Sequence, residues 1–152
     1  MCAPGDDARG VVFGRDLRVG TRYDLGSHLV TEAEIVEFAV QWDPQDFHVD
    51  AEAAEARHFG GIVASGLHTI GVYQRLAALC HLNRWKVIAG RGIRDLHFPR
   101  PVRPGDVLTG SFTIEGIRAT RTAGDIVTLV SRLVNQDGHP VLAMTSDVHV
   151  TH

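Results

Sequence analysis

The sequence lacks the cysteine pairs and the clustered basic residues that mark several common classes of protein. Only two of its 152 residues are cysteine, so Cys2 and Cys80 allow neither a disulfide framework nor a zinc ribbon. Cys80 lies in an apolar run and is predicted to be a small core residue. The net charge is −3, and no run of lysine or arginine forms the basic face that a phosphate backbone requires. We therefore expect no nucleic-acid partner.

Long hydrophobic runs and closely spaced metal ligands are also missing. The longest largely apolar stretch, from Ile62 to Leu82, is interrupted by six polar residues and is too polar to span a membrane. The N-terminus contains Asp6 and Asp7 and has no apolar core, which is unlike a secretory signal, so we expect a cytoplasmic location. Among nine histidines, only His149 and His152 lie close together in sequence, and we expect no metal site.

The composition that remains is typical of an ordinary soluble globular protein, with 44% hydrophobic and 22% charged residues. The length fits one domain with a sizeable core. Small, polar, glycine- and proline-broken residues at the start predict a disordered tail over residues 1–12. We place a single domain over residues 13–152.

Hydrophobic periodicity predicts two helices and a strand in the first half of the chain. A short strand is expected over residues 21–30. Thr31 and Glu34 form a capping-box pattern that opens a helix. Pro44 disfavours helical geometry in the residue before it, so this helix should end near Asp43. Its predicted apolar face consists of Ile35, Phe38, Ala39 and Trp42. A second short helix is expected over residues 51–57, with Asp50 as its N-cap.

A long apolar helix and further strands account for the rest of the chain. Residues 66–82 are apolar nearly all round, which predicts a helix buried on most sides. Extended segments are expected over residues 86–98, 108–115, 125–135 and 140–150, with Asp137-Gly138 as a tight turn before the last. The predicted fold class is α+β, a curved antiparallel sheet of about five strands wrapped around the long helix.

The segment "WDPQDFHVD" places Asp43 and His48 around Pro44, where regular helix is broken. A carboxylate and an imidazole that share a water molecule can take one proton from it and deliver another. The alternative is that Asp43 caps a turn and His48 is a half-buried surface histidine. Gly66 begins the long helix, so its backbone N–H can stabilise a carbonyl oxygen that gains negative charge. The alternative there is an ordinary helix start with Ser65 as N-cap.

These segments carry a resemblance to a known family. The stretches "TEAEIVEFAVQWDPQDFHVDAEAAEARHFGGIVASGLHTIGVYQRL" and "LHFPRPVRPGDVLTG" resemble the MaoC-like, (R)-specific enoyl-CoA hydratase family of hotdog-fold proteins. The resemblance implies a hydratase/dehydratase, a carbon–oxygen lyase that interconverts trans-2-enoyl-CoA and (R)-3-hydroxyacyl-CoA without a cofactor. It also implies that Asp43 and His48 are the catalytic pair, that Gly66 polarises the thioester carbonyl, and that the chain forms a homodimer or a dimer of dimers.

The chain departs from the family pattern within the catalytic segment. Many members have Asp-x-Asn-Pro-x-His, whereas Gln45 and Asp46 occupy the asparagine and inner proline positions here. Gln45 retains an amide that can orient the loop. If Asp46 points inward, it should raise the pKa of His48. The residues expected to contact substrate are Gln45, Ser65, His68, Arg94 and Arg103, with Arg100 a further candidate for the coenzyme A phosphates. His68 is alternatively a core histidine, and exposed arginines are often only solubilising.

Two other functions remain open from the sequence. Hotdog thioesterases need a carboxylate that activates water against the thioester carbonyl, but residues 66–82 contain no aspartate or glutamate. A non-catalytic acyl-CoA or acyl-carrier binding subunit would explain the altered loop, although both Asp43 and His48 are retained. The length and branching of the acyl chain, the choice between coenzyme A and carrier-protein thioesters, and the physiological direction all remain open.

Overall fold

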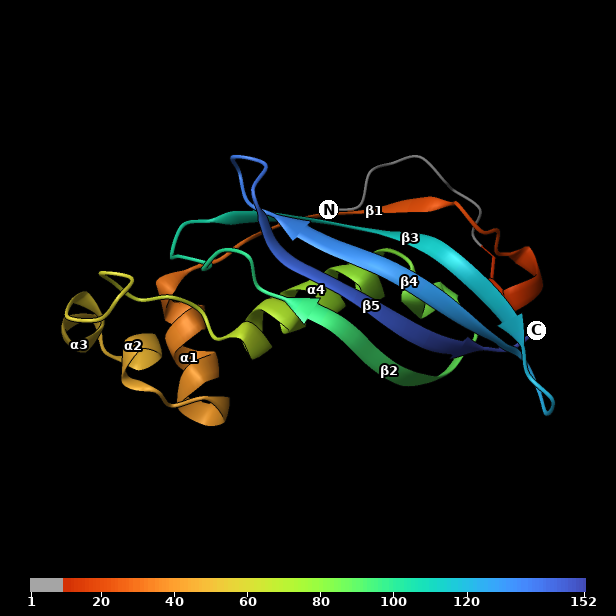
Figure 1. Ribbon diagram of the computed structural model, residues 1–152, viewed down its shortest axis with the longest axis horizontal. Helices are drawn as coiled ribbons and strands as arrows, with labels where there is room; N and C mark the ends of the chain where they lie inside the picture. The colour runs from red at the N-terminus through yellow and green to blue at the C-terminus, as the bar shows by residue number, and fades with distance from the viewer. Residues whose placement is uncertain (1–9) are drawn as a thin grey trace.

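Five antiparallel strands form one sheet in the order β1-β3-β4-β5-β2. The strands are β1 (Arg22–Leu29), β2 (Val87–His97), β3 (Val107–Ala119), β4 (Asp125–Val134) and β5 (Pro140–Val150). The computed structural model describes residues 10–152. Figure 1 shows the sheet spread along the long axis of the molecule, with the helices gathered beneath it and at one end. This arrangement confirms the predicted five-stranded antiparallel sheet.

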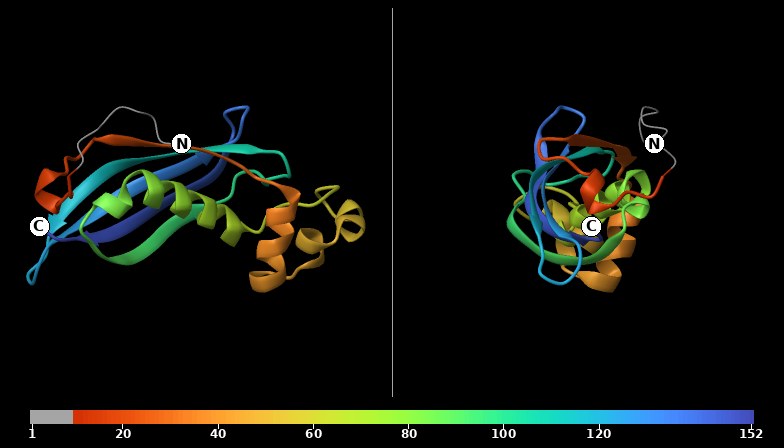
Figure 2. Two further views of the ribbon diagram at one scale, coloured as in Figure 1. Left: turned by 180° about the vertical axis from the view of Figure 1, so that it is seen from behind. Right: turned by 90° about the vertical axis from the view of Figure 1, so that its right-hand side faces the viewer.

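The sheet curves around the long helix α4 (Gly66–Cys80) without closing into a barrel. The end-on view in Figure 2 shows the strands bending around this helix. Alternating residues of β3 and β4 face α4 and are fully buried, among them Leu108, Ile114 and Val127. Burial of apolar side chains at about 25 cal/mol per Å² holds the helix against the sheet. The hotdog arrangement predicted from the sequence is confirmed.

One polar contact joins α4 to the sheet within this core. The hydroxyl of Tyr73 lies 2.6 Å from that of Ser131 on β4, and both residues are buried. Cys80 lies in the same apolar cluster, as predicted.

The expectation that α4 is buried on most sides was wrong for one stripe, because Leu67 and Leu79 are more than half exposed. That stripe faces away from the sheet.

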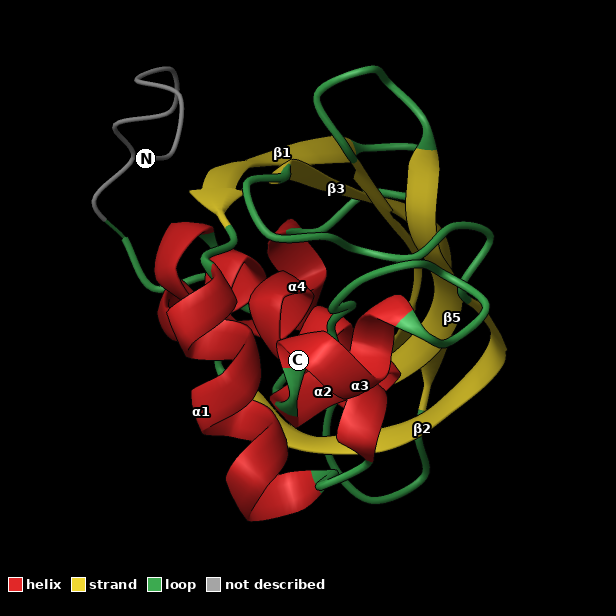
Figure 3. Cartoon of the chain, turned by 90° about the vertical axis from the view of Figure 1, so that its left-hand side faces the viewer, coloured by secondary structure: helices red, strands yellow, loops and turns green. Residues whose placement is uncertain are grey.

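Helices α1 (Glu32–Trp42), α2 (Asp46–Val49) and α3 (Ala51–Glu55) form a separate group at one end of the sheet, as Figure 3 shows. The Thr31 hydroxyl accepts the Glu34 N–H at 3.2 Å, which confirms Thr31 as the N-cap of α1. A capping box also requires the Glu34 carboxylate to accept the Thr31 backbone N–H. That part of the prediction was wrong, because this carboxylate pairs with His28 at 2.9 Å. The prediction that Trp42 belongs to the buried apolar face of α1 was also wrong, since 68% of its surface is exposed.

The predicted disordered tail over residues 1–12 falls mainly on residues 1–9, including Cys2, which lie outside the described residues. Val12 is part of the ordered fold. Its N–H donates to the Arg84 carbonyl at 2.8 Å, and its own carbonyl accepts from Lys86 at 2.8 Å. Across residues 10–152, no helix combines the length and the apolar character that crossing a membrane needs.

Candidate active site

The candidate site lies where the end of α1, helix α2 and the start of α4 meet. Asp43 is the C-cap of α1. Its backbone is no longer helical, with φ −156° and ψ 68°, because the following Pro44 disfavours helical geometry. His48 lies on α2, which corrects the expectation that this segment is entirely loop. The one-turn helix begins two residues after Pro44, so the proline interrupts the chain without preventing a new turn. Ser65 caps α4, as the alternative interpretation of this helix start had it, and accepts the Leu67 N–H.

The carboxylate of Asp43 is held from two sides. The Ser65 hydroxyl donates to Oδ2 at 2.6 Å, and the Gln45 side-chain amide donates to Oδ1 at 2.8 Å. These two hydrogen bonds, with the nearby His48, lower the pKa of Asp43 below its ordinary value. The carboxylate is therefore ionised at neutral pH. The Gln45 amide thus holds Asp43 in place within the segment that also carries His48.

His48 is fixed with one ring nitrogen turned toward Asp43. Only 5% of its surface is exposed, and its Nδ1 lies 2.6 Å from the Val63 carbonyl. A carbonyl only accepts hydrogen bonds, so Nδ1 carries the proton and Nε2 is left with a lone pair in the neutral imidazole. Nε2 lies 3.4 Å from Asp43 Oδ2. The structure therefore brings together two groups that can both accept a proton.

A hollow of about 250 Å³ is lined by His48 of this pair, though not by Asp43, and reaches the first residue of α4. Gly66 is that residue, and no carbonyl precedes it within the helix to accept its bond, so its N–H is available at the positive end of the helix dipole. A Cβ at this position would fall 2.8 Å from the ring of Phe98. Glycine at this position therefore allows the Phe98 ring to pack closely against the start of α4. The hollow is lined by His48 and Gly66, and otherwise mostly by the apolar residues Phe47, Phe59, Val63, Phe98, Pro99, Pro101 and Val102.

Of the three candidate arginines, Arg94 and Arg103 do not line this hollow. Arg94, on β2, donates to Asp147 of β5 at 2.6 Å, which places it in a sheet ion pair. Arg103 donates to the Phe59 carbonyl at 2.9 Å and lines a separate hollow beside α3. Arg100 does line the hollow with His48 and Gly66. Pro99 and Pro101, which flank Arg100, line the same hollow.

His68 and Asp46 also lie apart from the Asp43–His48 pair. His68 stacks on Phe38 of α1 at 5.0 Å, and its Nε2 lies 3.8 Å from Glu34. Burial lowers its pKa, so it is a neutral histidine packed between α1 and α4. Asp46 accepts a hydrogen bond from Arg57 at the surface. The hypothesis that Asp46 points inward toward His48 was therefore wrong, because the Arg57 guanidinium holds its carboxylate outside.

Among the described residues, no cluster of three or more histidine, cysteine, aspartate or glutamate side chains could hold a metal ion. The polar groups at the site are the Asp43–His48 pair, the Ser65 hydroxyl and the start of α4. Such a set can exchange protons with a water molecule beside a carbonyl that a helix N-terminus polarises. The fold and the site therefore define a hotdog domain with an acid–base pair at the end of its central helix.

Comparison with known proteins agrees with this class. Residues 16–136 match the family model described as "MaoC like domain". In Bacillus subtilis, the uncharacterized protein YdeM is 30% identical over 121 residues, covering 80% of this chain and 86% of that one. The 3-hydroxyacyl-thioester dehydratase Z of Mycobacterium tuberculosis is 29% identical over 111 residues, covering 72% and 73%. The chain belongs to the MaoC-like domain family.

Solved structures show the same relationship. The crystal structure of a MaoC-like dehydratase from Rhodospirillum rubrum is 38% identical, with a TM-score of 0.84 and coverage of 93% of this chain and 97% of that one. The (R)-hydratase from A. caviae involved in PHA biosynthesis is 25% identical, with a TM-score of 0.74 and coverage of 89% and 98%. Structural neighbours of this chain thus include dehydratases and (R)-hydratases of hotdog fold.

Proposed function

We propose that the protein catalyses the reversible hydration of trans-2-enoyl-CoA to (R)-3-hydroxyacyl-CoA. One observation carries the proposal. Asp43 Oδ2 and His48 Nε2 lie 3.4 Å apart, and His48 lines a hollow that also contains Gly66 at the start of α4. Membership of the MaoC-like family and the printed names of a thioester dehydratase and an (R)-hydratase among its relatives support the same reaction. No cofactor enters the reaction, and the coenzyme A thioester is the substrate.

In the proposed mechanism the thioester carbonyl accepts the Gly66 N–H. The helix dipole and this N–H stabilise the negative charge that develops on the carbonyl oxygen. A water molecule held between Asp43 and His48 gives a proton to the pair as its oxygen forms a bond to the β-carbon. The double-bond electrons move toward the carbonyl to give an enolate. The pair then returns one proton to the α-carbon, and water has been added overall.

A thioesterase is a less suitable interpretation of this site. Water attack on the thioester carbonyl would need a carboxylate aimed at that carbon, and α4 contributes none. The carboxylate of Asp43 is instead paired with His48 and oriented by Ser65. A non-catalytic subunit that only binds acyl-CoA has the same fold but makes no use of this pairing. Release of free coenzyme A, or binding without turnover, would distinguish these two functions.

We further propose a cytoplasmic homodimer. Strand β2 is an edge of the sheet, and its apolar side chains Val87, Ile88, Ile93 and Leu96 are exposed. An edge strand of 11 residues presents a row of unpaired backbone groups that a second copy can pair with. Exposed apolar surface of this extent is typical of a protein–protein contact. A dimer would cover both features.

The direct test of the proposed reaction follows the loss of enoyl-thioester ultraviolet absorbance with a panel of trans-2-enoyl-CoAs. We expect turnover by the wild type and a loss of at least about 100-fold in both Asp43→Asn and His48→Gln, the range for general acid–base groups. Both substitutions preserve size, so circular dichroism should show an unchanged fold. Activity at the wild-type level in either variant would exclude the pair as the catalytic groups.

A further inference from the structure

An apolar groove of about 450 Å³ lies between α4 and strand β2, outside the hollow at His48. Leu129 of β4 and Met144 of β5 form its floor, both almost fully buried. One wall is a face of α4 and the other is the middle of β2. The wall residues on α4 are Ile70, Tyr73, Gln74 and Ala78, and those on β2 include Val87, Gly90, Gly92 and Ile93.

The groove lies further along α4 than the hollow at His48, and the two share no lining residue. Residues four and seven positions apart share a face of an α-helix, so Gly66, Ile70 and Tyr73 are aligned. Thr69 lines the hollow that contains His48 and Gly66, and the next residue, Ile70, lines the groove. From Gly66 to Ala78 the helix rises about 18 Å. A thioester whose carbonyl meets the Gly66 N–H therefore has an apolar groove ahead of it along the helix.

Two glycines of β2 open the opposite wall. Neither Gly90 nor Gly92 has a positive φ, and a Cβ built at either position meets no atom within 4 Å. The backbone conformation and packing of this chain thus admit larger residues at both positions. The register of β2 shifts between them, and this bulge does not use the left-handed geometry that would require glycine. Glycine inside a strand weakens it and often marks a place where a ligand approaches closely.

We infer that the straight apolar chain of the acyl group lies in this groove, and that Gly90 and Gly92 set how long a chain it accepts. The inference rests on the proposed function, because it takes the thioester carbonyl to be at Gly66. The lining is apolar along Ile70, Leu129 and Met144, which suits a hydrocarbon chain. Side chains at positions 90 and 92 would project into the space that the chain occupies. Gly90 and Gly92 are specificity-determining residues in this arrangement.

Binding of saturated acyl-CoAs tests the inference without any turnover, because these thioesters have no double bond to hydrate. Calorimetry with butanoyl-, hexanoyl-, octanoyl- and decanoyl-CoA should show a Kd that falls about fourfold for each buried methylene in the wild type. In Gly92→Leu the affinity for butanoyl-CoA should be unchanged, while the gain on lengthening the chain is lost. Ala89→Leu adds a comparable side chain to β2 at a position that does not line the groove, and it should retain the wild-type profile.

Sedimentation and circular dichroism should first show that these variants keep the oligomeric state and fold of the wild type. If Gly92→Leu does not fold, Ala78→Leu narrows the groove from the helix side and should give the same loss. A wild-type Kd that is independent of chain length would overturn the inference, as would an unchanged profile in the folded groove variants. Chain-dependent binding without hydration of any enoyl-CoA would instead contradict the proposed function and leave the groove assignment standing.

Discussion

At the scale of single residues, the position of Asp43 depends on Ser65 more than on any other side chain. Their hydrogen bond is 2.6 Å long and Ser65 is only 1% exposed, so water cannot readily replace the hydroxyl. The same hydroxyl accepts the Leu67 N–H and so also caps α4. One buried serine thus couples the ionisation of Asp43 to the start of the helix that presents the Gly66 N–H. Ser65 is a positioning residue for both groups.

Replacement of Ser65 by alanine should move the acid limb of the pH–rate profile. The bond from Ser65 is the largest of the effects that lower the pKa of Asp43, so its removal raises that pKa. A higher pKa means that activity is lost at a higher pH as the solution is acidified. Loss of the N-cap should also lower the free energy of unfolding by about 1 kcal/mol. Ser65→Thr, which keeps a hydroxyl, is the matched control, and an acid limb that is identical in Ser65→Ala would argue against this coupling.

At the scale of elements, the Tyr73–Ser131 contact ties α4 to the middle of the sheet. Both hydroxyls are buried, and burial raises the pKa of Tyr73 to about 12, so the phenol stays protonated. Tyr73→Phe leaves the Ser131 hydroxyl without this partner and should reduce the free energy of unfolding by about 1–3 kcal/mol in urea titrations. In the double variant with Ser131→Ala, part of that loss should be recovered. Equal losses in the single and double variants would show that the contact contributes little.

Ionisation of the same tyrosine predicts how stability depends on alkaline pH. The folded pKa of about 12 lies above the ordinary value of 10.0, so the folded state holds this proton more tightly than the unfolded state. Its contribution is complete below pH 10 and is lost as the pH rises toward 12. The wild type should therefore lose more stability over this interval than Tyr73→Phe does.

The elements themselves followed largely from local sequence patterns. The cap at Thr31, the end of α1 before Pro44 and the alternation of β3 and β4 all express short-range rules, and the sequence predicted each of them. The predicted roles of Arg94 and Asp46 at the site were wrong because each forms an ion pair with a residue outside its own element. Arg94 pairs with Asp147 of β5, and Asp46 pairs with Arg57, which follows α3. Such ion pairs leave no periodic signal. The short helix that carries His48 was missed because a single turn is too brief to show periodicity.

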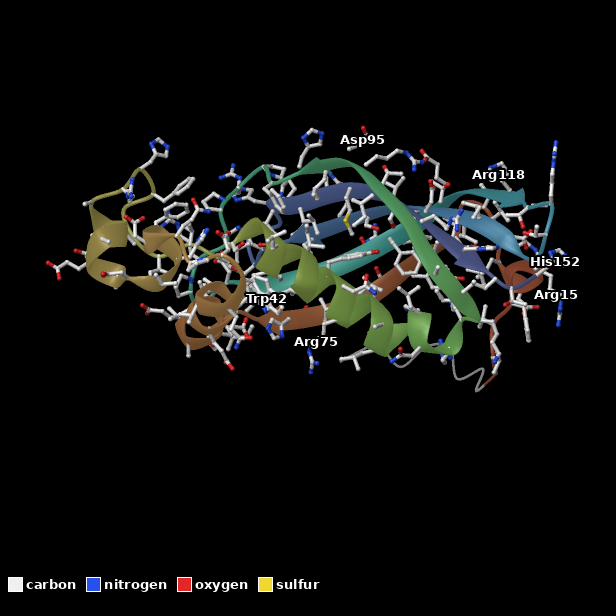
Figure 4. All side chains as sticks on the ribbon, turned by 90° about the horizontal axis from the view of Figure 1, so that it is seen from below. Arg15, Trp42, Arg75, Asp95, Arg118 and His152 are labelled. Atoms are coloured by element: carbon white, nitrogen blue, oxygen red, sulfur yellow. The ribbon has the colours of Figure 1, made fainter. Side chains whose placement is uncertain are left out.

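At the scale of the whole molecule, the two ends differ in character. Figure 4 shows Trp42 at the helical end, to which the Asp43–His48 pair belongs, and Arg118 and His152 at the opposite end of the sheet. The exposed apolar edge of β2 runs between these ends. The position of the site at the join between helices and sheet was predictable only through the family resemblance. Neither composition nor periodicity specifies which helices meet at the N-terminus of α4.

The proposed dimer gives a prediction at the same scale. Analytical ultracentrifugation should give twice the mass of the chain at micromolar concentration, and Ile88→Lys on the β2 edge should shift the protein toward monomer. A lysine on an edge strand disfavours pairing with another sheet. Val19→Lys places the same charge at an exposed residue outside the strands and should leave the dimer intact. A wild type that sediments as a monomer would rule out the dimer.

Mass spectrometry of the product formed from a trans-2-enoyl-CoA in oxygen-18-labelled water tests the central claim most directly. The account predicts an intact coenzyme A thioester that carries one labelled hydroxyl on its β-carbon in the (R) configuration. It also predicts that the product does not form with Asp43→Asn. Label found in a free carboxylic acid, together with released coenzyme A, would contradict hydration and identify the Asp43–His48 site as one that hydrolyses the thioester.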